Sequence, residues 1–247
     1  MNDANSRLWQ TRYGLVAAMP AGNHAARSLL QYGEWMEQEL DMLSTWLQDG
    51  QTVLEFGAEY GCHALCMAQT VGDAGTVHVV EPVRLAFQLL CANLALNGMR
   101  NVHTSSNWLG AGQGNIAAAA IEQRGSHAAE DGEVFRISNV DAMGLQSLHL
   151  LKISIPGTLR GVLAGATDTL QTHRPIIYAR LGGVDTAEAE IRALKELDYR
   201  CWSHTPYMFN ADNHAGQTGN IFPGCVSQNV IAVPVEASCD LDPALEL

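Results

Sequence analysis

The feature that most constrains the fold is a pair of short apolar runs, each ending at polar residues, with a helical pattern between them. The first run is QTVLEF at 51–56 and leads into the turn GAEYG at 57–61; the second is TVHVVE at 76–81, which ends on Glu81. Two parallel strands need a crossover connection, usually a helix, so this order predicts a strand–helix–strand unit. Gly57 and Gly61 permit a tight turn in which a Cβ would be strained. The chain is therefore expected to be an α/β protein.

The same alternation of apolar runs and helical patterns continues along the chain. Further strands are predicted at 101–105, 133–138, 148–154, 175–181, 199–204 and 229–235, and helices at 61–71, 82–97, 159–173 and 186–197. Pro82 is placed to open the second of these helices. This order predicts a mostly parallel sheet with helices on both faces.

The N-terminal part and two later stretches do not follow this alternation. Residues 25–48 have helical periodicity that breaks near Gly33. We therefore divide the chain into an N-terminal helical segment, residues 1–48, that packs over the ligand-binding edge of the sheet, and a main domain, residues 49–247. The alanine run 117–120 suggests a helix within a poorly informative stretch, and the Gly/Asn-rich residues 210–228 predict a long loop of the kind that is often functional.

Charge and composition exclude several classes of partner. The chain carries a net charge of −12, with 47% hydrophobic residues. An acidic chain repels phosphate backbones and anionic lipid, so neither a nucleic-acid substrate nor a membrane partner is expected. The N-terminus is polar, and no apolar run approaches the roughly 18 residues of a membrane span. Six cysteines occur without a C-x-x-C pair, which favours free thiols, no metal site and a cytoplasmic location.

The acids around the first turn indicate the class of ligand. An open α/β sheet binds ligands at the carboxyl ends of its strands. There, Glu81 can accept hydrogen bonds from both ribose hydroxyls of an adenosine. Glu55 and Glu59 would repel the pyrophosphate of a dinucleotide, whereas they would attract the ammonium and sulfonium of S-adenosyl-L-methionine (SAM). The charge pattern therefore favours SAM over NAD, and an NAD-dependent oxidoreductase is the weaker alternative.

Beyond these local patterns, the chain resembles the FkbM-type methyltransferases, SAM-dependent enzymes that mostly O-methylate sugars and natural-product hydroxyls. The resembling segments are RSLLQYGEWMEQELDML (27–43), the strand–turn–helix–strand unit 53–82, LLCANLALNGMRNV (89–102), and the stretches 148–181 and 209–234. The resemblance implies a Rossmann-like class I methyltransferase fold, with a seven-stranded sheet and a final antiparallel strand. It also implies SAM as the cofactor, a small-molecule hydroxyl as the substrate, and a homodimer as the common assembly of the class.

Matching positions of the family's motifs imply a set of cofactor-binding residues. The set consists of Tyr32, Glu34, Glu55, Gly57, Ala58, Glu59, Gly61, Glu81, Pro82 and Asp141. In this set, Tyr32 and Glu34 belong to the N-terminal segment that closes over the cofactor. Asp141 is expected near the adenine or the rim of the active site. Asn213, in the late loop, matches a position that the family usually fills with Asn.

One departure from the family concerns the strand at 148–154. The family pattern after its lysine has three acids, whereas this chain has Ser154, Pro156 and Leu159 at those positions. A carboxylate there would serve as general base or orient the substrate. Ser154 is a poor base, so the histidines of the C-terminal part, His204 and His214, are the remaining candidates because their pKa values suit that task.

Two functions remain open at this level. The first is a SAM-dependent O-methyltransferase for a small hydroxylated molecule, with His204, His214 or Ser154 as the catalytic group. The second is a SAM-binding protein that has lost methylation and serves as a scaffold or partner subunit, because the acids are absent while the cofactor turn is intact.

Overall fold

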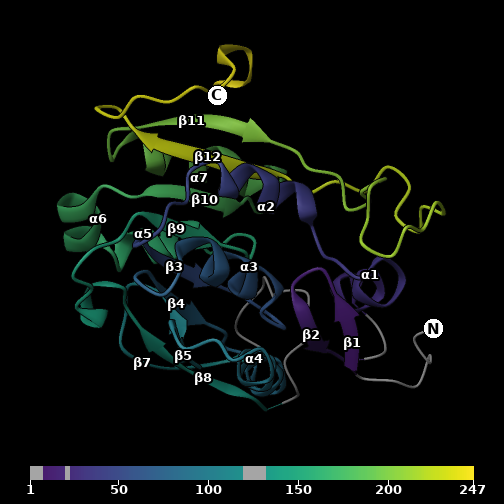
Figure 1. Ribbon diagram of the computed structural model, residues 1–247. Coiled ribbons are helices and arrows are strands. Elements are labelled where there is room, and N and C mark those ends of the chain that lie inside the picture. The colour runs from purple at the N-terminus through teal and green to yellow at the C-terminus, as the bar shows by residue number, and fades with distance from the viewer. Residues whose placement is uncertain (1–7, 20–22, 119–131) are drawn as a thin grey trace.

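A seven-stranded sheet forms the centre of the computed structural model, which describes residues 8–19, 23–118 and 132–247 (Figure 1). The strand order is β11-β12-β10-β9-β3-β4-β5. The strands are β3 (Thr52–Phe56), β4 (Thr76–Val80), β5 (Val102–Ser105), β9 (Leu150–Ile153), β10 (Ile176–Arg180), β11 (Tyr199–His204) and β12 (Asn229–Pro234). Among the described strands of this sheet, β12 alone runs opposite to the others, antiparallel to β10 and β11 on its two sides. The mostly parallel sheet with a final antiparallel strand is therefore confirmed.

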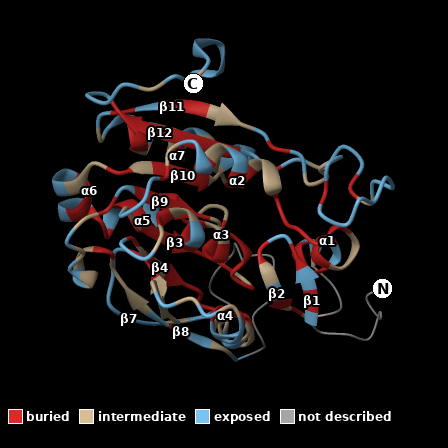
Figure 2. Ribbon diagram, viewed as in Figure 1, coloured by how far each residue is buried: buried red, intermediate tan, exposed pale blue. Residues whose placement is uncertain are grey.

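Helices cover both faces of this sheet, as the alternating pattern predicts. The helices of the main part are α3 (Cys62–Val71), α4 (Arg84–Leu96), α5 (Leu159–Ala164), α6 (Thr167–His173) and α7 (Val184–Lys195), with short 3-10 turns η2 (Asp141–Met143) and η3 (Pro243–Leu245). Alternate strand residues belong to different cores: Val53 packs with the α3 and α4 side, and Leu54 packs with the α5–α7 side. Figure 2 shows the central strands as buried.

Two helix boundaries differ from the sequence-based prediction. The helix α4 begins at Arg84 after an extended N-cap at Val83, so Pro82 precedes the helix and does not open it. The single helix predicted at 159–173 is two helices separated at Gly165. A Cβ at Gly165 would lie 2.3 Å from the carbonyl oxygen of Gly110, so the chain breaks where two backbone segments approach closely.

The N-terminal segment adds a hairpin that the sequence analysis missed. The strands β1 (Leu8–Thr11) and β2 (Gly14–Ala17) precede α1 (His24–Tyr32) and α2 (Glu37–Ser44). The side chains of Asn93 and Asn97 on α4 hydrogen-bond the backbone of β2, which fixes the hairpin to the main part. Gly33 ends α1 in a left-handed conformation, at the break that the periodicity indicated. The division at residue 48 stays a prediction.

A small second sheet lies beside the first, where the sequence was least informative. It consists of β6 (Trp108–Leu109), β7 (Gly114–Ala117) and β8 (Val134–Ser138) in the order β6-β8-β7. The suggested helix at 117–120 is wrong at Ala117, which ends β7, and residues 119 and 120 lie outside the described part. No helix within the described ranges is long and apolar enough to span a membrane.

Candidate active site

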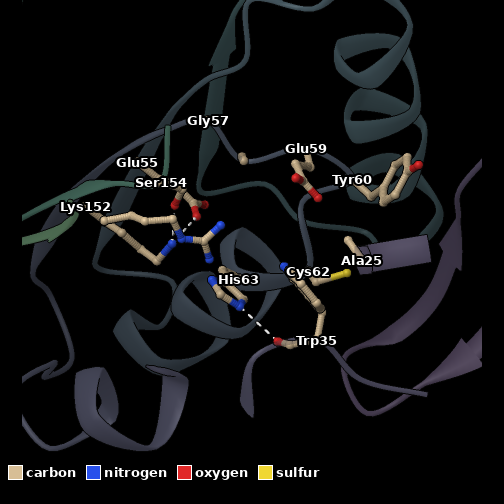
Figure 3. A pocket seen from close by; sticks show the side chains of 12 residues that line it. Ala25, Trp35, Glu55, Gly57, Glu59, Tyr60, Cys62, His63, Lys152 and Ser154 are labelled. Carbon is tan, nitrogen blue, oxygen red and sulfur yellow. Dashed lines mark hydrogen bonds and ion pairs between the residues drawn. The ribbon is translucent and has the colours of Figure 1, made fainter. Parts of the chain in front are cut away.

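A polar cleft opens at the carboxyl ends of β3, β9 and β10, beneath the connection between α1 and α2 (Figure 3). Its lining consists of Ala25, Trp35, Glu55, Gly57, Ala58, Glu59, Tyr60, Cys62, His63, Lys152, Ser154 and Arg180. The chain runs outward from β3 to β4 and β5 on one side, and from β9 to β10 on the other. The cleft therefore lies at the point where the strand order reverses, which is where open α/β sheets bind ligands.

Strand register explains why these charged side chains meet. Glu55 pairs with Lys152 across β3 and β9, and Lys152 pairs with Tyr178 across β9 and β10. Side chains alternate between the two faces of a strand, so Arg180, two residues after Tyr178, lies on the same face. The apolar residues between them fill the opposite core. A polar cluster is thus built on the α3 face of an otherwise apolar sheet.

The turn after β3 forms one wall of the cleft. Gly57 and Gly61 have φ values of 87° and 82°, which L-residues with a Cβ rarely adopt. A Cβ on Gly57 would lie 2.4 Å from Ile155, and one on Gly61 would lie 2.4 Å from Leu90. Glu59 has a positive φ of 52° without being glycine. This backbone directs the Glu59 side chain toward the cleft, as Figure 3 shows.

A buried glutamate of the N-terminal segment organises the cations of the cleft. Glu39, on α2, lies 3.2 Å from Arg180, 3.8 Å from Lys152 and 3.9 Å from His63. Burial raises the pKa of the Glu39 carboxyl, but the charges of Arg180 and Lys152 outweigh it and lower that pKa to about 2. Burial and the Lys152 charge lower the pKa of His63 to about 3. His63 is therefore neutral, and Glu39 is an anion at neutral pH.

Two other carboxyl groups face the cleft with unused acceptors. Glu55 forms an ion pair of 3.1 Å with Lys152 through Oε1. Among the described residues, neither Glu55 Oε2 nor Glu59 Oε2 has a hydrogen-bond partner, although both atoms are buried. Burial raises the pKa of Glu55, and it raises the pKa of Glu59 to about 7. Such buried acceptors are rare in native proteins, which indicates a ligand that carries donors or positive charge.

Glu81 lies behind this wall, at the end of β4. Its two carboxyl oxygens accept backbone N–H groups of Glu59, at 2.8 Å, and Val83, at 2.9 Å. Burial raises the pKa of Glu81 to about 8. A carboxyl group keeps acceptor lone pairs in either protonation state, so acceptor capacity remains beside the two backbone bonds. Glu81 thus holds the turn after β3 in place.

Tyr32 and Glu34, the two N-terminal residues of the predicted cofactor-binding set, bind the loop between β11 and β12 and do not line the cleft. The Tyr32 hydroxyl donates to the Gly219 carbonyl at 2.8 Å and accepts the Ile221 N–H at 2.7 Å. The Glu34 carboxylate accepts from Arg12 and from the side chain of Asn210. Both residues therefore join α1 and the turn that follows it to the loop between β11 and β12.

Of the remaining predicted residues, Asp141, His204 and His214 do not line the cleft. Asp141 accepts the N–H and the hydroxyl of Thr169 and so caps the beginning of α6. His204 Nδ1 hydrogen-bonds the Tyr178 hydroxyl at 2.7 Å, and burial lowers the pKa of His204. The backbone N–H of His214 donates to Glu34. Of the three catalytic candidates, only Ser154 lines the cleft, where its hydroxyl bonds the Lys152 ammonium.

Sequence analysis missed Glu39, His63 and Arg180 as site residues. A signal existed for Glu39, because it lies one turn from the buried residues Met36 and Leu43 on an amphipathic helix, and a charge on such a face is rarely buried without a partner. Arg180 is the last residue of the apolar strand β10. It lies two residues after Tyr178, so the two side chains share one face of the strand. Nothing in the local sequence of His63 separates it from an ordinary helical residue.

The arrangement matches the sheet of known methyltransferases. Precorrin-6y C5,15-methyltransferase from Geobacter metallireducens GS-15 superposes with a TM-score of 0.52 at 13% identity, covering 80% of this chain and 86% of that protein. Methyltransferase FkbM from Methylobacillus flagellatus KT has a TM-score of 0.52 at 11% identity, covering 86% of this chain but 55% of that protein. No family model and no curated protein matches the sequence.

Identities this low carry the fold and not the activity. In the described residues, no group of three or more His, Cys, Asp or Glu side chains is arranged to hold a metal ion. The cleft is lined by carboxyl groups, two cations and backbone groups. The chain has the Rossmann-like methyltransferase fold, with its polar cleft at the position where that fold binds ligands.

Proposed function

We propose that this protein is a SAM-dependent methyltransferase that methylates a hydroxyl oxygen of a small molecule. The observation that carries the proposal is a pair of buried oxygens in the cleft of a methyltransferase fold, Glu55 Oε2 and Glu59 Oε2, which have no hydrogen-bond partner in the part of the chain that the structure describes. The resemblance to FkbM-type enzymes supports the hydroxyl acceptor. The net charge of −12 supports a small molecule over a nucleic acid, because phosphate backbones would be repelled.

The donor set of the cleft fits SAM better than a dinucleotide. SAM carries an ammonium and a sulfonium, which the free carboxylate oxygens of Glu55 and Glu59 attract. The remaining acceptor capacity of Glu81 suits the two ribose hydroxyls. A pyrophosphate in the same place would be repelled by the two acids, and Lys152 beside it is already paired with Glu55. These contacts support SAM as the cofactor.

Each residue of the cleft has a different role in the proposed methyl transfer. Bound SAM supplies the methyl group. Glu55 holds the ammonium end, and the Lys152 ammonium fixes the Ser154 hydroxyl, which orients the acceptor. Glu59 accepts the proton of the acceptor hydroxyl at its free Oε2. Its pKa of about 7 lies near neutral pH, where proton transfer by a carboxylate is most effective. Glu59 thereby takes the role for which the sequence suggested His204 or His214.

Calorimetric titration tests the cofactor directly. We expect micromolar binding of SAM and S-adenosylhomocysteine (SAH), and no binding of NADH under the same conditions. The folded state of the sample is checked by its melting transition. A folded protein that binds neither SAM nor SAH would contradict the proposal, and tight binding of NADH would redirect it to an oxidoreductase.

The second candidate is a SAM-binding scaffold or partner subunit without activity. The neutral residues Ser154, Pro156 and Leu159 after β9 favour it, because the acceptor side has no carboxylate there. Transfer of label from [methyl-³H]SAM to a small-molecule extract separates the two candidates. Label transfer above that of a heat-denatured sample supports the enzyme. SAM binding without any transfer supports the scaffold.

A further inference from the structure

The cleft has opposite charges on its two sides, and this polarity bears on the acceptor. The end of β3 and the turn after it carry Glu55 and Glu59 (Figure 3), whereas the ends of β9 and β10 carry Lys152 and Arg180. The residues that follow β9, from 154 to 159, are all uncharged. A cationic cofactor therefore matches the first side, and the second side is positively charged toward whatever lies beside the cofactor.

Arg180 lines the cleft and has a buried donor without a partner among the described residues. A guanidinium has five N–H donors in a fixed plane. Glu39 accepts one of them from Nη2 at 3.2 Å, which fixes the plane of the group. The Nε atom is buried and, within the described ranges, has no hydrogen-bond partner. Lys152, by contrast, is bonded to Glu55 and Ser154. A ligand anion would thus gain most from the Nε edge of Arg180.

We propose that the methyl acceptor carries a carboxylate in addition to its hydroxyl, and that this carboxylate binds to the Nε edge of Arg180. The inference rests on the proposed methyltransferase function. Two parallel N–H···O bonds from a guanidinium match the geometry of a carboxylate. Glu39 acts as a positioning residue, because its ion pair aligns the guanidinium. The acceptor class is therefore a small hydroxy acid or an acidic sugar.

The carboxylate of SAM itself is the competing source of the same chemistry. If Arg180 held that group, its loss would weaken SAH binding, because SAH retains the amino-acid carboxylate. If Arg180 holds the acceptor, SAH binding survives its loss. Removal of Arg180 also leaves Glu39 with one cation fewer, so the double variant with Glu39→Gln serves as the variant without an unpaired buried charge.

The experiment measures label transfer from [methyl-³H]SAM to small molecules extracted from the cells that produce the protein. The extract is first separated on an anion exchanger into anionic and neutral fractions. For the unaltered protein we expect label in the anionic fraction. For Arg180→Gln, and for Arg180→Gln with Glu39→Gln, we expect transfer to fall about tenfold or more, with the Kd for SAH changed less than about threefold. Arg180→Lys is expected to retain part of the transfer, because lysine keeps the positive charge but lacks the planar guanidinium that donates two parallel N–H bonds.

Each other outcome overturns a defined part of the argument. Label confined to the neutral fraction contradicts the carboxylate and leaves the methyltransferase function standing. A Kd for SAH that rises about tenfold in both glutamine variants assigns Arg180 to the cofactor and also overturns the inference. SAH binding without label in any fraction contradicts the proposed enzymatic function, and the acceptor inference is then overturned with it.

Discussion

The ends of β3 and β9 lie side by side at one edge of the sheet, yet they differ in chemistry. After β3, two positive-φ glycines and two acids form a wall whose shape the backbone dictates. After β9, the chain continues with Ser154 and neutral residues, and the charge comes from Lys152 and from Arg180 on the neighbouring strand. The difference indicates that the β3 side, which we propose binds the cofactor, is fixed by a local sequence. The β9–β10 side, which we propose binds the acceptor, is assembled from distant segments.

The strongest way to break this comparison is to remove the acid that holds the acceptor side together. Glu39→Ala leaves Arg180 and Lys152 as buried cations with fewer counter-charges, so we expect a loss of about 3–5 kcal/mol of unfolding free energy. Urea denaturation measures it. The matched control is Glu188→Ala, whose exposed ion pair with Arg192 should contribute less than about 1 kcal/mol. Equal effects of the two variants would show that the Glu39 cluster does not stabilise the fold.

The next largest effect is expected on the cofactor side. Glu81→Ala removes the acceptor of the Glu59 and Val83 N–H groups and the proposed ribose contact. Hydrogen bonds of a neutral carboxyl group contribute about 0.5–1.5 kcal/mol each, so the loss of two ribose contacts should raise the Kd for SAH about tenfold, as measured by calorimetry. Glu236→Ala, on the surface, is the control and should leave the Kd unchanged. An unchanged Kd in Glu81→Ala would remove Glu81 from the cofactor site.

A change of pH tests the charge of the β3 side of the cleft without a mutation. Because burial raises the pKa of Glu59 to about 7, the folded protein retains this proton above the usual range of a carboxyl. The stability that it contributes is present below about pH 4.5 and is lost as the pH rises through about 7. Binding of a cation favours the ionised form, so the affinity for SAM should rise up to about tenfold between pH 6 and 8.

Calorimetry of Glu59→Gln across that range isolates this effect. The variant should show a flatter pH dependence of SAM affinity than the unaltered protein, because its amide does not titrate. Glu37→Gln is a suitable comparison, since burial also raises the pKa of Glu37 but this residue does not line the cleft. A Glu59→Gln profile as steep as that of the unaltered protein would assign the pH dependence to another group, such as Glu81.

The smallest effect is expected outside both sides of the cleft. Tyr32→Phe removes the hydroxyl that bonds Gly219 and Ile221 of the late loop. A loss of about 1 kcal/mol in stability is expected for such bonds, measured by urea denaturation, with no change in the Kd for SAH. A weaker SAH affinity at equal stability would place Tyr32 in the cofactor site, as the family resemblance implies.

Much of the fold follows from periodicity alone. The strands predicted at 51–56 and 76–81 are β3 and β4, each one residue shorter, and the clean amphipathic pattern at 186–197 is α7, shifted by two residues. The failures have physical reasons. Gly165 divides a helix because another backbone lies against it, and the hairpin before α1 depends on two asparagines of α4, far away in the sequence. Neither interaction leaves a periodic signal in the local sequence.

The sequence by itself determined the sheet, the turn of Gly57 and Gly61, and the acids Glu55, Glu59 and Glu81. Each depends on local rules, namely the period of the apolar residues and the need for positive φ. Only the tertiary structure decided the other half of the cleft, where Glu39 and Arg180 meet although they are separated by 141 positions in the chain. The tertiary structure also places His204 and His214 outside the lining of the cleft. Ion pairs across the fold depend on packing, and no local pattern specifies them.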